Sequence, residues 1–249
     1  MYFKLLACDV LTREVCYCIA RSPHSIDPVF TEKGEHNDPP AMKARLQEII
    51  DAASETGQYD AVLLAYGLCG NATVGLTARQ CPLVIPRAHD CTTLFLGSKE
   101  AFQEHFGQNP SQTWASVGYA ERGDTVISDD STRKHLGLEQ SYEELVEMYG
   151  EENVAYMLDM LKTEHGSDDV VFIRVPETHN EAAFARIRKQ IEEEGKPLRE
   201  ILGNIRVINH LLSGEWPEAD FLVAPPGHTV APVYDTVEVV RAMPGAATE

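Results

Sequence analysis

Cysteines and histidines are the residues of this chain most able to do chemistry. All six cysteines fall within the first 91 of the 249 residues, at Cys8, Cys16, Cys18, Cys69, Cys81 and Cys91. Cys8, Cys69 and Cys91 each follow an apolar run that is typical of a buried strand, and each is followed by turn residues. In a reducing compartment such thiols are packing residues, metal ligands or catalytic groups more often than disulfides. These three cysteines are therefore the candidate functional thiols.

The other three cysteines are interpreted as packing residues. Cys16 and Cys18 lie two residues apart in a predicted helix that starts near Thr12, so they point to different faces and do not share a ligand easily. Cys81 precedes Pro82 at the start of a strand, which is the end away from the candidate site.

A zinc site is the leading hypothesis for the three candidate thiols. His89 and Cys91 form a His-x-Cys pair, to which Cys8 and Cys69 add two thiols and the loop histidine His36 another imidazole. Zinc takes sulfur and nitrogen ligands, and a catalytic zinc keeps one position open for water or substrate. In this interpretation Asp90 supports the ligands or accepts a proton, and Arg87 anchors the substrate. The loop residues Gly67, Gly70 and Asn71, around Cys69, are expected to contact the cofactor.

Two alternatives use the same residues. Cys8, Cys69 and Cys91 could bind three irons of a [4Fe–4S] cluster and leave the fourth iron open to a substrate oxygen, with the sulfurs spread more widely than around one zinc ion. Without any metal, Cys69 would be a nucleophile and His89 its base, provided that a helix amino terminus lowered the thiol pKa.

The elements that position these residues alternate between apolar runs and amphipathic segments. The predicted strands cover residues 2–7, 26–30, 61–65, 82–86, 170–175, 198–202 and 220–224, with helices between them. This order predicts an α/β fold, a Rossmann-like parallel sheet with helices on both faces. Such sheets bind ligands at the carboxyl ends of their strands, where neighbouring strands lie about 5 Å apart. The candidate residues are therefore expected to converge there.

The expected domain organisation has three parts. Residues 1–106 form an α/β half that contains the cysteines, residues 107–137 form an irregular excursion or lid, and residues 138–249 form a second α/β half packed on the first, or continuous with it. Two of the helices of the second half are expected at residues 141–149 and 151–164.

Charge and composition exclude some classes of function. The net charge is −18, and no cluster of Lys and Arg offsets it, so a role in nucleic-acid binding is not expected. The apolar start of the chain is interrupted by Asp9, which favours neither a signal peptide nor a membrane span. A cytoplasmic protein that acts on a small-molecule substrate is predicted.

Several segments resemble a family of bacterial and archaeal proteins known as a domain of unknown function. They are Leu5 to Asp9, Gly34-x-His36-x-x-Pro39, Tyr66-Gly67-Leu68-Cys69-Gly70, Pro86-Arg87-Ala88-His89-Asp90-Cys91 and Phe221 to Gly227. Members of that family are often encoded near corrinoid-dependent methyltransferases. The resemblance implies one-carbon metabolism, with a corrinoid protein or a methyltransferase as partner.

Together these observations predict a metal-dependent enzyme with a zinc-type Cys/His site that catalyses methyl or small-group transfer. One alternative is a [4Fe–4S] lyase or dehydratase that uses the same cysteines. The other is a non-catalytic protein that delivers a metal or cofactor to a corrinoid methyltransferase system.

Overall fold

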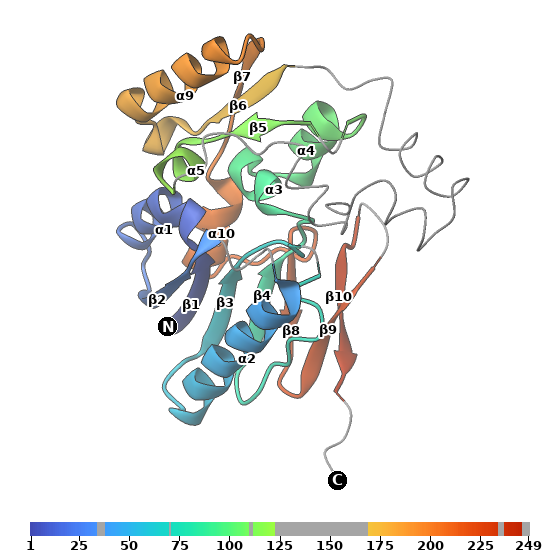
Figure 1. The fold of residues 1–249 in the computed structure, drawn as a ribbon. Coiled ribbons are helices and arrows are strands. Elements are labelled where there is room, and N and C mark those ends of the chain that lie inside the picture. The colour runs from blue at the N-terminus through green and yellow to red at the C-terminus, as the bar shows by residue number, and fades with distance from the viewer. Residues whose placement is uncertain (34–37, 70, 110–111, 123–168, 234–236, 246–249) are drawn as a thin grey trace, which may run out of the picture.

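The structure is a computed structural model that describes residues 1–33, 38–69, 71–109, 112–122, 169–233 and 237–245. A mixed α/β architecture is built around a five-stranded sheet (Figure 1). In spatial order its strands are β2 (Ser25–Thr31), β1 (Tyr2–Cys8), β3 (Ala61–Ala65), β4 (Leu83–Pro86) and β8 (Phe221–Ala224). The first four strands run parallel, so their carboxyl ends share one edge.

Helices cover both faces of this sheet. The helix α2 (Pro39–Glu55) begins at Asp38, whose carboxylate accepts a hydrogen bond from the amide of Ala41 at 3.1 Å. Its apolar stripe packs on one face, while α1 (Thr12–Ile19) and α10 (Arg206–Ser213) pack on the other. All five residues of β3 are buried, as a central strand between two helical layers requires.

A second, smaller sheet lies beside the first. It consists of β5 (Trp114–Ala115), β6 (Val170–Arg174) and β7 (Leu198–Leu202), all parallel, and α9 (Glu181–Glu193) packs on it. The short helices α3 (Cys91–Leu96), α4 (Lys99–Phe106) and α5 (Val117–Glu121) belong to the chain between β4 and β6. The 3₁₀ turns η1 (Asp9–Leu11) and η3 (Pro176–Thr178) follow β1 and β6.

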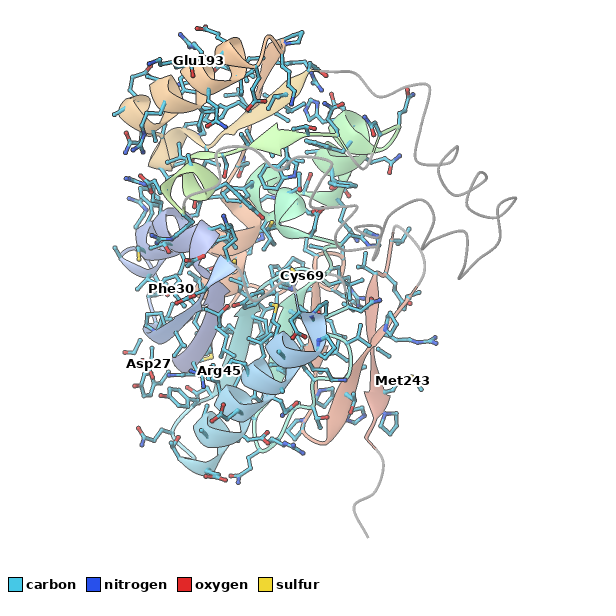
Figure 2. The ribbon with its side chains drawn as sticks, in the orientation of Figure 1. Asp27, Phe30, Arg45, Cys69, Glu193 and Met243 are labelled. Carbon is cyan, nitrogen blue, oxygen red and sulfur yellow. The ribbon has the colours of Figure 1, made fainter. Side chains whose placement is uncertain are left out.

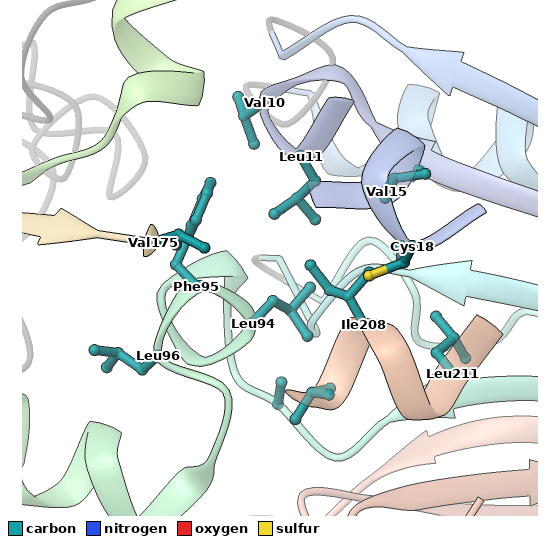
Figure 3. Close-up of a cluster of buried hydrophobic side chains, with 14 of the residues drawn as sticks. Val10, Leu11, Val15, Cys18, Leu94, Phe95, Leu96, Val175, Ile208 and Leu211 are labelled. Atoms are coloured by element: carbon teal, nitrogen blue, oxygen red, sulfur yellow. The ribbon is translucent and has the colours of Figure 1, made fainter. Parts of the chain in front are cut away.

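One hydrophobic cluster is shared by the two sheets. Figure 3 shows Leu94 and Phe95 of α3 together with Leu11 of η1 and Ile208 of α10. The same cluster contains Phe3 and Leu5 of the first sheet and Val171 and Ile173 of the second, and most of these side chains are fully buried. This shared core holds the two sheets in one packed unit.

The prediction of an α/β fold with parallel strands and helices is confirmed, but the sheet is not clearly Rossmann-like and is partly antiparallel. The strand β8 runs antiparallel to β4, with Val84 opposite Val223, and the hairpin of β9 (His228–Pro232) and β10 (Val240–Pro244) is antiparallel as well. The apolar run at residues 220–224 predicted a buried parallel strand. They form a sheet edge instead, where Val223 is 40% exposed.

The predicted excursion at residues 107–137 contains regular structure where it is described. Both β5 and α5 fall inside it, and Trp114 and Tyr119 are buried in the shared core. Residues 123–137 and the helices predicted at 141–149 and 151–164 lie outside the described residues. Among the helices that the structure describes, none has the length and apolar character needed to cross a membrane.

A buried carboxyl group links α1 of the first sheet to η3 of the second. Glu14 is 2% exposed and accepts a hydrogen bond from the hydroxyl of Thr178. Its other carboxylate oxygen, Oε2, has no hydrogen-bond partner among the described residues. Burial raises the pKa of Glu14 above its ordinary value of 4.5, against the opposing effects of Thr178 and Arg13.

The raised pKa of Glu14 predicts a pH-dependent loss of stability. The protonated carboxyl stabilises the fold below about pH 4.5, and this contribution disappears as the pH rises through the folded-state pKa. Because Glu14→Gln stays neutral, its stability relative to the parent protein is expected to increase over the same pH range. Urea unfolding of both proteins between pH 4 and pH 8 measures this difference. A difference that does not vary with pH, or one matched by the exposed-site variant Glu48→Gln, would contradict the prediction.

Candidate functional site

Three cysteines line one cavity at the edge of the five-stranded sheet, the main sheet, where its parallel strands have their carboxyl ends. Cys8 ends β1, Cys69 follows β3, and Cys91 begins α3 after β4. The cavity measures about 180 Å³, and we call it the cysteine cavity. The other residues that line it are Thr31, Glu32, Lys33, Met42, Ala65, Tyr66, Asp90 and Tyr119. Figure 2 shows Cys69 close to the start of α2, to which Met42 belongs.

Parallel pairing brings the first two thiols to the same edge. Ala7 of β1 lies opposite Ala65 of β3, so both strands reach the edge in register. Cys8 is the next residue of β1, and Cys69 lies four residues beyond the end of β3. The predicted convergence of Cys8, Cys69 and Cys91 is therefore present in the structure.

Backbone hydrogen bonds join the loops that follow β3 and β4. The amide of Leu68 donates to the carbonyl of Ala88 at 2.9 Å, and the amide of Cys69 donates to the carbonyl of His89 at 3.1 Å. Cys69 itself has a left-handed backbone with φ +47°. The pairing holds the Cys69 loop against the segment that leads into Cys91.

Gly67 makes this pairing possible. A Cβ atom at this position would lie 2.6 Å from the backbone nitrogen of Asp90 and 2.7 Å from its Cα. The hydroxyl of Thr73, a fully buried residue, donates to the carbonyl of Gly67 at 3.2 Å. Gly67 therefore has a structural role beside the site, where cofactor contact was expected.

Burial raises the pKa of two of the cavity thiols, Cys69 and Cys91. The pKa of Cys69 is raised to about 12, mainly by burial and to a smaller extent by the nearby groups of Cys8 and Asp90. Burial also raises the pKa of Cys91 well above its usual range, with additional effects of Asp90 and Cys69, while the hydrogen bond from Tyr119 opposes the rise. A nucleophilic Cys69 needs the reverse shift, so the direction of this shift does not favour the metal-free hypothesis.

Asp90 lines the cysteine cavity and also begins α3. Its carboxylate accepts a hydrogen bond from the amide of Thr93 at 3.4 Å. Burial raises the pKa of Asp90, and its hydrogen bonds to Thr93 and Thr92 partly offset that rise. Of the two residues expected to act on substrate, only Asp90 lines the cavity.

His89 is directed elsewhere. Its side chain is exposed and lines a separate cavity of about 510 Å³ with Thr93, Lys99 and Phe102. The carbonyl of His89 accepts the hydrogen bond from the amide of Cys69. The structure does not bring the expected imidazole ligand to the three thiols.

Arg87 binds backbone in the C-terminal part of the chain. Its guanidinium is buried and donates to the carbonyls of Glu218 at 2.8 Å, Glu238 at 2.7 Å, and Val240. Arg87 therefore connects the end of β4 to the β9–β10 hairpin and does not line the cysteine cavity. The expected substrate anchor is a scaffold residue.

The remaining predicted residues contribute little to the described site. Asn71 is exposed with φ +68° and does not line the cysteine cavity. Gly70 and His36 lie outside the described residues. Cys18 is buried as a packing residue, whereas Cys16 is exposed and Cys81 is partly buried.

Several cavity residues carried no recognised sequence signal. The hydroxyls of Tyr66 and Thr31 lie 2.5 Å apart, and the hydroxyl of Tyr119 lies 3.0 Å from the sulfur of Cys91. The ammonium of Lys33 lies 5.8 Å from the centre of the Tyr119 ring. Tyr66 could have been found because it follows β3 directly. Tyr119 belongs to the segment that shows no clear periodicity.

The side chains of the cysteine cavity are not arranged around one metal position. Over the described ranges, no group of three or more His, Cys, Asp or Glu side chains is placed so that it could hold a metal ion. The three thiols share one cavity but do not form a ready-made site for one small ion.

Comparison with protein families identifies one relationship. Residues 30–212 match the family described as "Protein of unknown function (DUF1638)". The chain belongs to this family. The matched segment of this DUF1638 protein includes Cys69 and Cys91, whereas Cys8 precedes it. Comparison with curated proteins and with solved structures found no match.

Arg87→Ala is expected to destabilise the protein by roughly 2–4 kcal/mol, because three carbonyl groups lose a charged donor in a buried position. Urea unfolding measures the loss. The control is Arg79→Ala, which removes an exposed ion pair with Asp51 and should cost about 1 kcal/mol or less. Equal losses in the two variants would contradict a scaffold role for Arg87.

Gly67→Ala is expected to separate the two loops, at a cost of about 1–3 kcal/mol for the close contact with Asp90. The thiols of Cys69 and Cys91 should then react faster with iodoacetamide, which mass spectrometry of the digested protein measures. Gly195→Ala is the control. A Cβ atom at Gly195 would meet no other atom within 4 Å, so this substitution strains the backbone, which has φ +69°, without creating a close contact. Unchanged thiol reactivity in Gly67→Ala would show that the loops do not depend on this contact.

Proposed function

We propose that this DUF1638 protein binds an iron–sulfur cluster through Cys8, Cys69 and Cys91 and uses it in a lyase or dehydratase reaction on a small molecule. One observation carries the proposal: three cysteines from three strand ends line one cavity, whereas His89 lines another. The cavity thus offers three thiols, together with the carboxyl groups of Glu32 and Asp90, and does not include the imidazole of the expected Cys/His zinc site.

The donor set fits a cluster better than a single zinc ion. A structural or catalytic zinc collects its ligands around one point, at about 2.3 Å for sulfur. The described His, Cys, Asp and Glu side chains do not offer such a group. A [4Fe–4S] cluster carries each ligating cysteine on a different iron, so its sulfurs are farther apart. The three cysteines come from separate strand ends and line one cavity.

A metal centre at these cysteines would have to displace the thiol protons. Burial is the largest cause that raises the pKa of Cys69 and of Cys91, and the neighbouring cysteines and Asp90 add to the rise. Ligation requires the deprotonated sulfur, so loading the centre releases the thiol protons.

When bound by three cysteines, a [4Fe–4S] cluster supplies an open iron that acts as a Lewis acid toward a substrate oxygen. The chain's own residues provide the surroundings. The carboxyl group of Asp90 lines the cavity beside Cys91. The paired hydroxyls of Tyr66 and Thr31 offer hydrogen bonds to a polar substrate.

Methyl or small-group transfer and a corrinoid partner remain predictions from the sequence. Membership of the DUF1638 family neither favours nor opposes them, because the family description names no activity. A zinc site at the same thiols is the outcome that would favour methyl transfer over the lyase chemistry.

Anaerobic purification and reconstitution with iron and sulfide test the proposal. The parent protein is expected to hold about four irons and four sulfides per chain, with broad visible absorption. Cys8→Ala, Cys69→Ala and Cys91→Ala should each lose most of that iron, whereas Cys16→Ala, at an exposed cysteine, should retain it.

Stoichiometric zinc without iron would overturn the cluster and support a mononuclear site. A reconstituted protein that binds neither metal, with a folded circular-dichroism spectrum, would overturn the proposal as a whole. If all three cysteine variants retained their iron, the iron would be bound by other residues, and the proposed ligands would be wrong.

A further inference from the structure

We propose that Tyr119 is a positioning residue that donates a hydrogen bond to the ligating sulfur of Cys91 and thereby raises the reduction potential of the bound centre. This inference rests on the proposed function. The cysteines of the site come from the five-stranded sheet and its loops. Tyr119 lies in α5, which follows β5 of the second sheet, so it brings a side chain from that part of the fold to the site.

The contact between Tyr119 and Cys91 is direct. The phenol oxygen lies 3.0 Å from the cysteine sulfur, a distance at which either group can donate in the unligated protein. A ligating sulfur has lost its proton and can only accept. The hydroxyl of Tyr119 is then the donor, and the hydrogen bond becomes charge-assisted and stronger.

The phenol is held firmly in this position. Tyr119 is 5% exposed, and its ring packs edge-on against Trp114, with 4.9 Å between the ring centres. Ser116 is the residue that caps the start of α5. Its hydroxyl accepts a hydrogen bond from the amide of Tyr119 at 3.4 Å. A Cβ atom at the neighbouring Gly118 would overlap the carbonyl of Val10, so α5 lies tightly against η1.

Lys33 strengthens the effect of the phenol. Its ammonium lies 5.8 Å from the centre of the Tyr119 ring and donates to the carbonyl of Arg122 at 3.2 Å. Lys33 also lines the cysteine cavity and is 9% exposed, so its charge is only weakly screened. A cation near the ring makes the phenol a better donor, and its field favours the more negative, reduced state of a metal centre.

A hydrogen bond to a ligating sulfur withdraws electron density from it and stabilises the reduced centre more than the oxidised one. Removal of the hydroxyl should therefore lower the reduction potential. A lower potential makes the centre easier to oxidise, so it should also decay faster in air. Neither change is expected if Tyr119 serves only to fill space, because phenylalanine keeps the ring.

The experiment compares reconstituted parent protein with Tyr119→Phe and with Tyr59→Phe. Tyr59 is the matched control, since its hydroxyl bonds to Asp27 and does not line the cysteine cavity. Iron and sulfide content is measured first, and the midpoint potential is then measured by spectroscopic titration. The expected result is a more negative potential and faster loss of absorption in air for Tyr119→Phe alone.

A second variant guards against a structural artefact. Replacement of Tyr119 by 3-fluorotyrosine keeps the ring and makes the hydroxyl a stronger donor, so the potential should move in the opposite direction, above that of the parent protein. Opposite shifts for the two variants cannot come from lost packing. This measurement also decides the proposal if Tyr119→Phe fails to fold.

The outcomes separate the two proposals. If the parent protein loads no iron, the proposed function fails, and the role of Tyr119 fails with it. If the parent protein loads iron but Tyr119→Phe and the fluorotyrosine variant both keep the potential of Tyr59→Phe, only the role of Tyr119 is overturned.

Discussion

Backbone pairing between the loops after β3 and β4 is the interaction on which the site depends. The amides of Leu68 and Cys69 bind carbonyls of the opposite loop, and the missing side chain of Gly67 lets the two backbones approach. Without this contact, Cys69 and Cys91 would lie on independent loops. Because Asp90 at the close approach also begins α3, the pairing sets the position from which Cys91 and the buried face of α3 start.

The electrostatics of the cavity follow from the same closeness. Burial raises the pKa of Cys69 and Cys91, and the closeness of Cys8, Asp90 and the other thiols adds to the rise. Around the thiols, the protein supplies an ammonium from Lys33 and a phenol from Tyr119. The main sheet thus gathers the sulfurs, and the second sheet reaches them through α5. The shared hydrophobic core fixes the distance between the two sheets.

Side-chain direction separates the residues that line the site from those that only flank it. Arg87, His89 and Asp90 are near neighbours in the sequence, yet their side chains have three different surroundings. Arg87 is bound by carbonyls of the C-terminal segment, which lies more than 130 residues away in the chain. A short loop can direct consecutive side chains to opposite sides, and only the packed surroundings decide which side each one takes.

The sequence by itself determined the local elements and the thiol positions. Apolar runs at residues 61–65 and 82–86 became the central strands, and Cys8, Cys69 and Cys91 followed three strand ends because side-chain type and spacing are local properties. Tertiary structure alone decided the antiparallel direction of β8, the scaffold role of Arg87 and the contact of Tyr119 with Cys91. Those features join segments far apart in the chain, and the hydrophobic pattern of one segment carries no information about its partner.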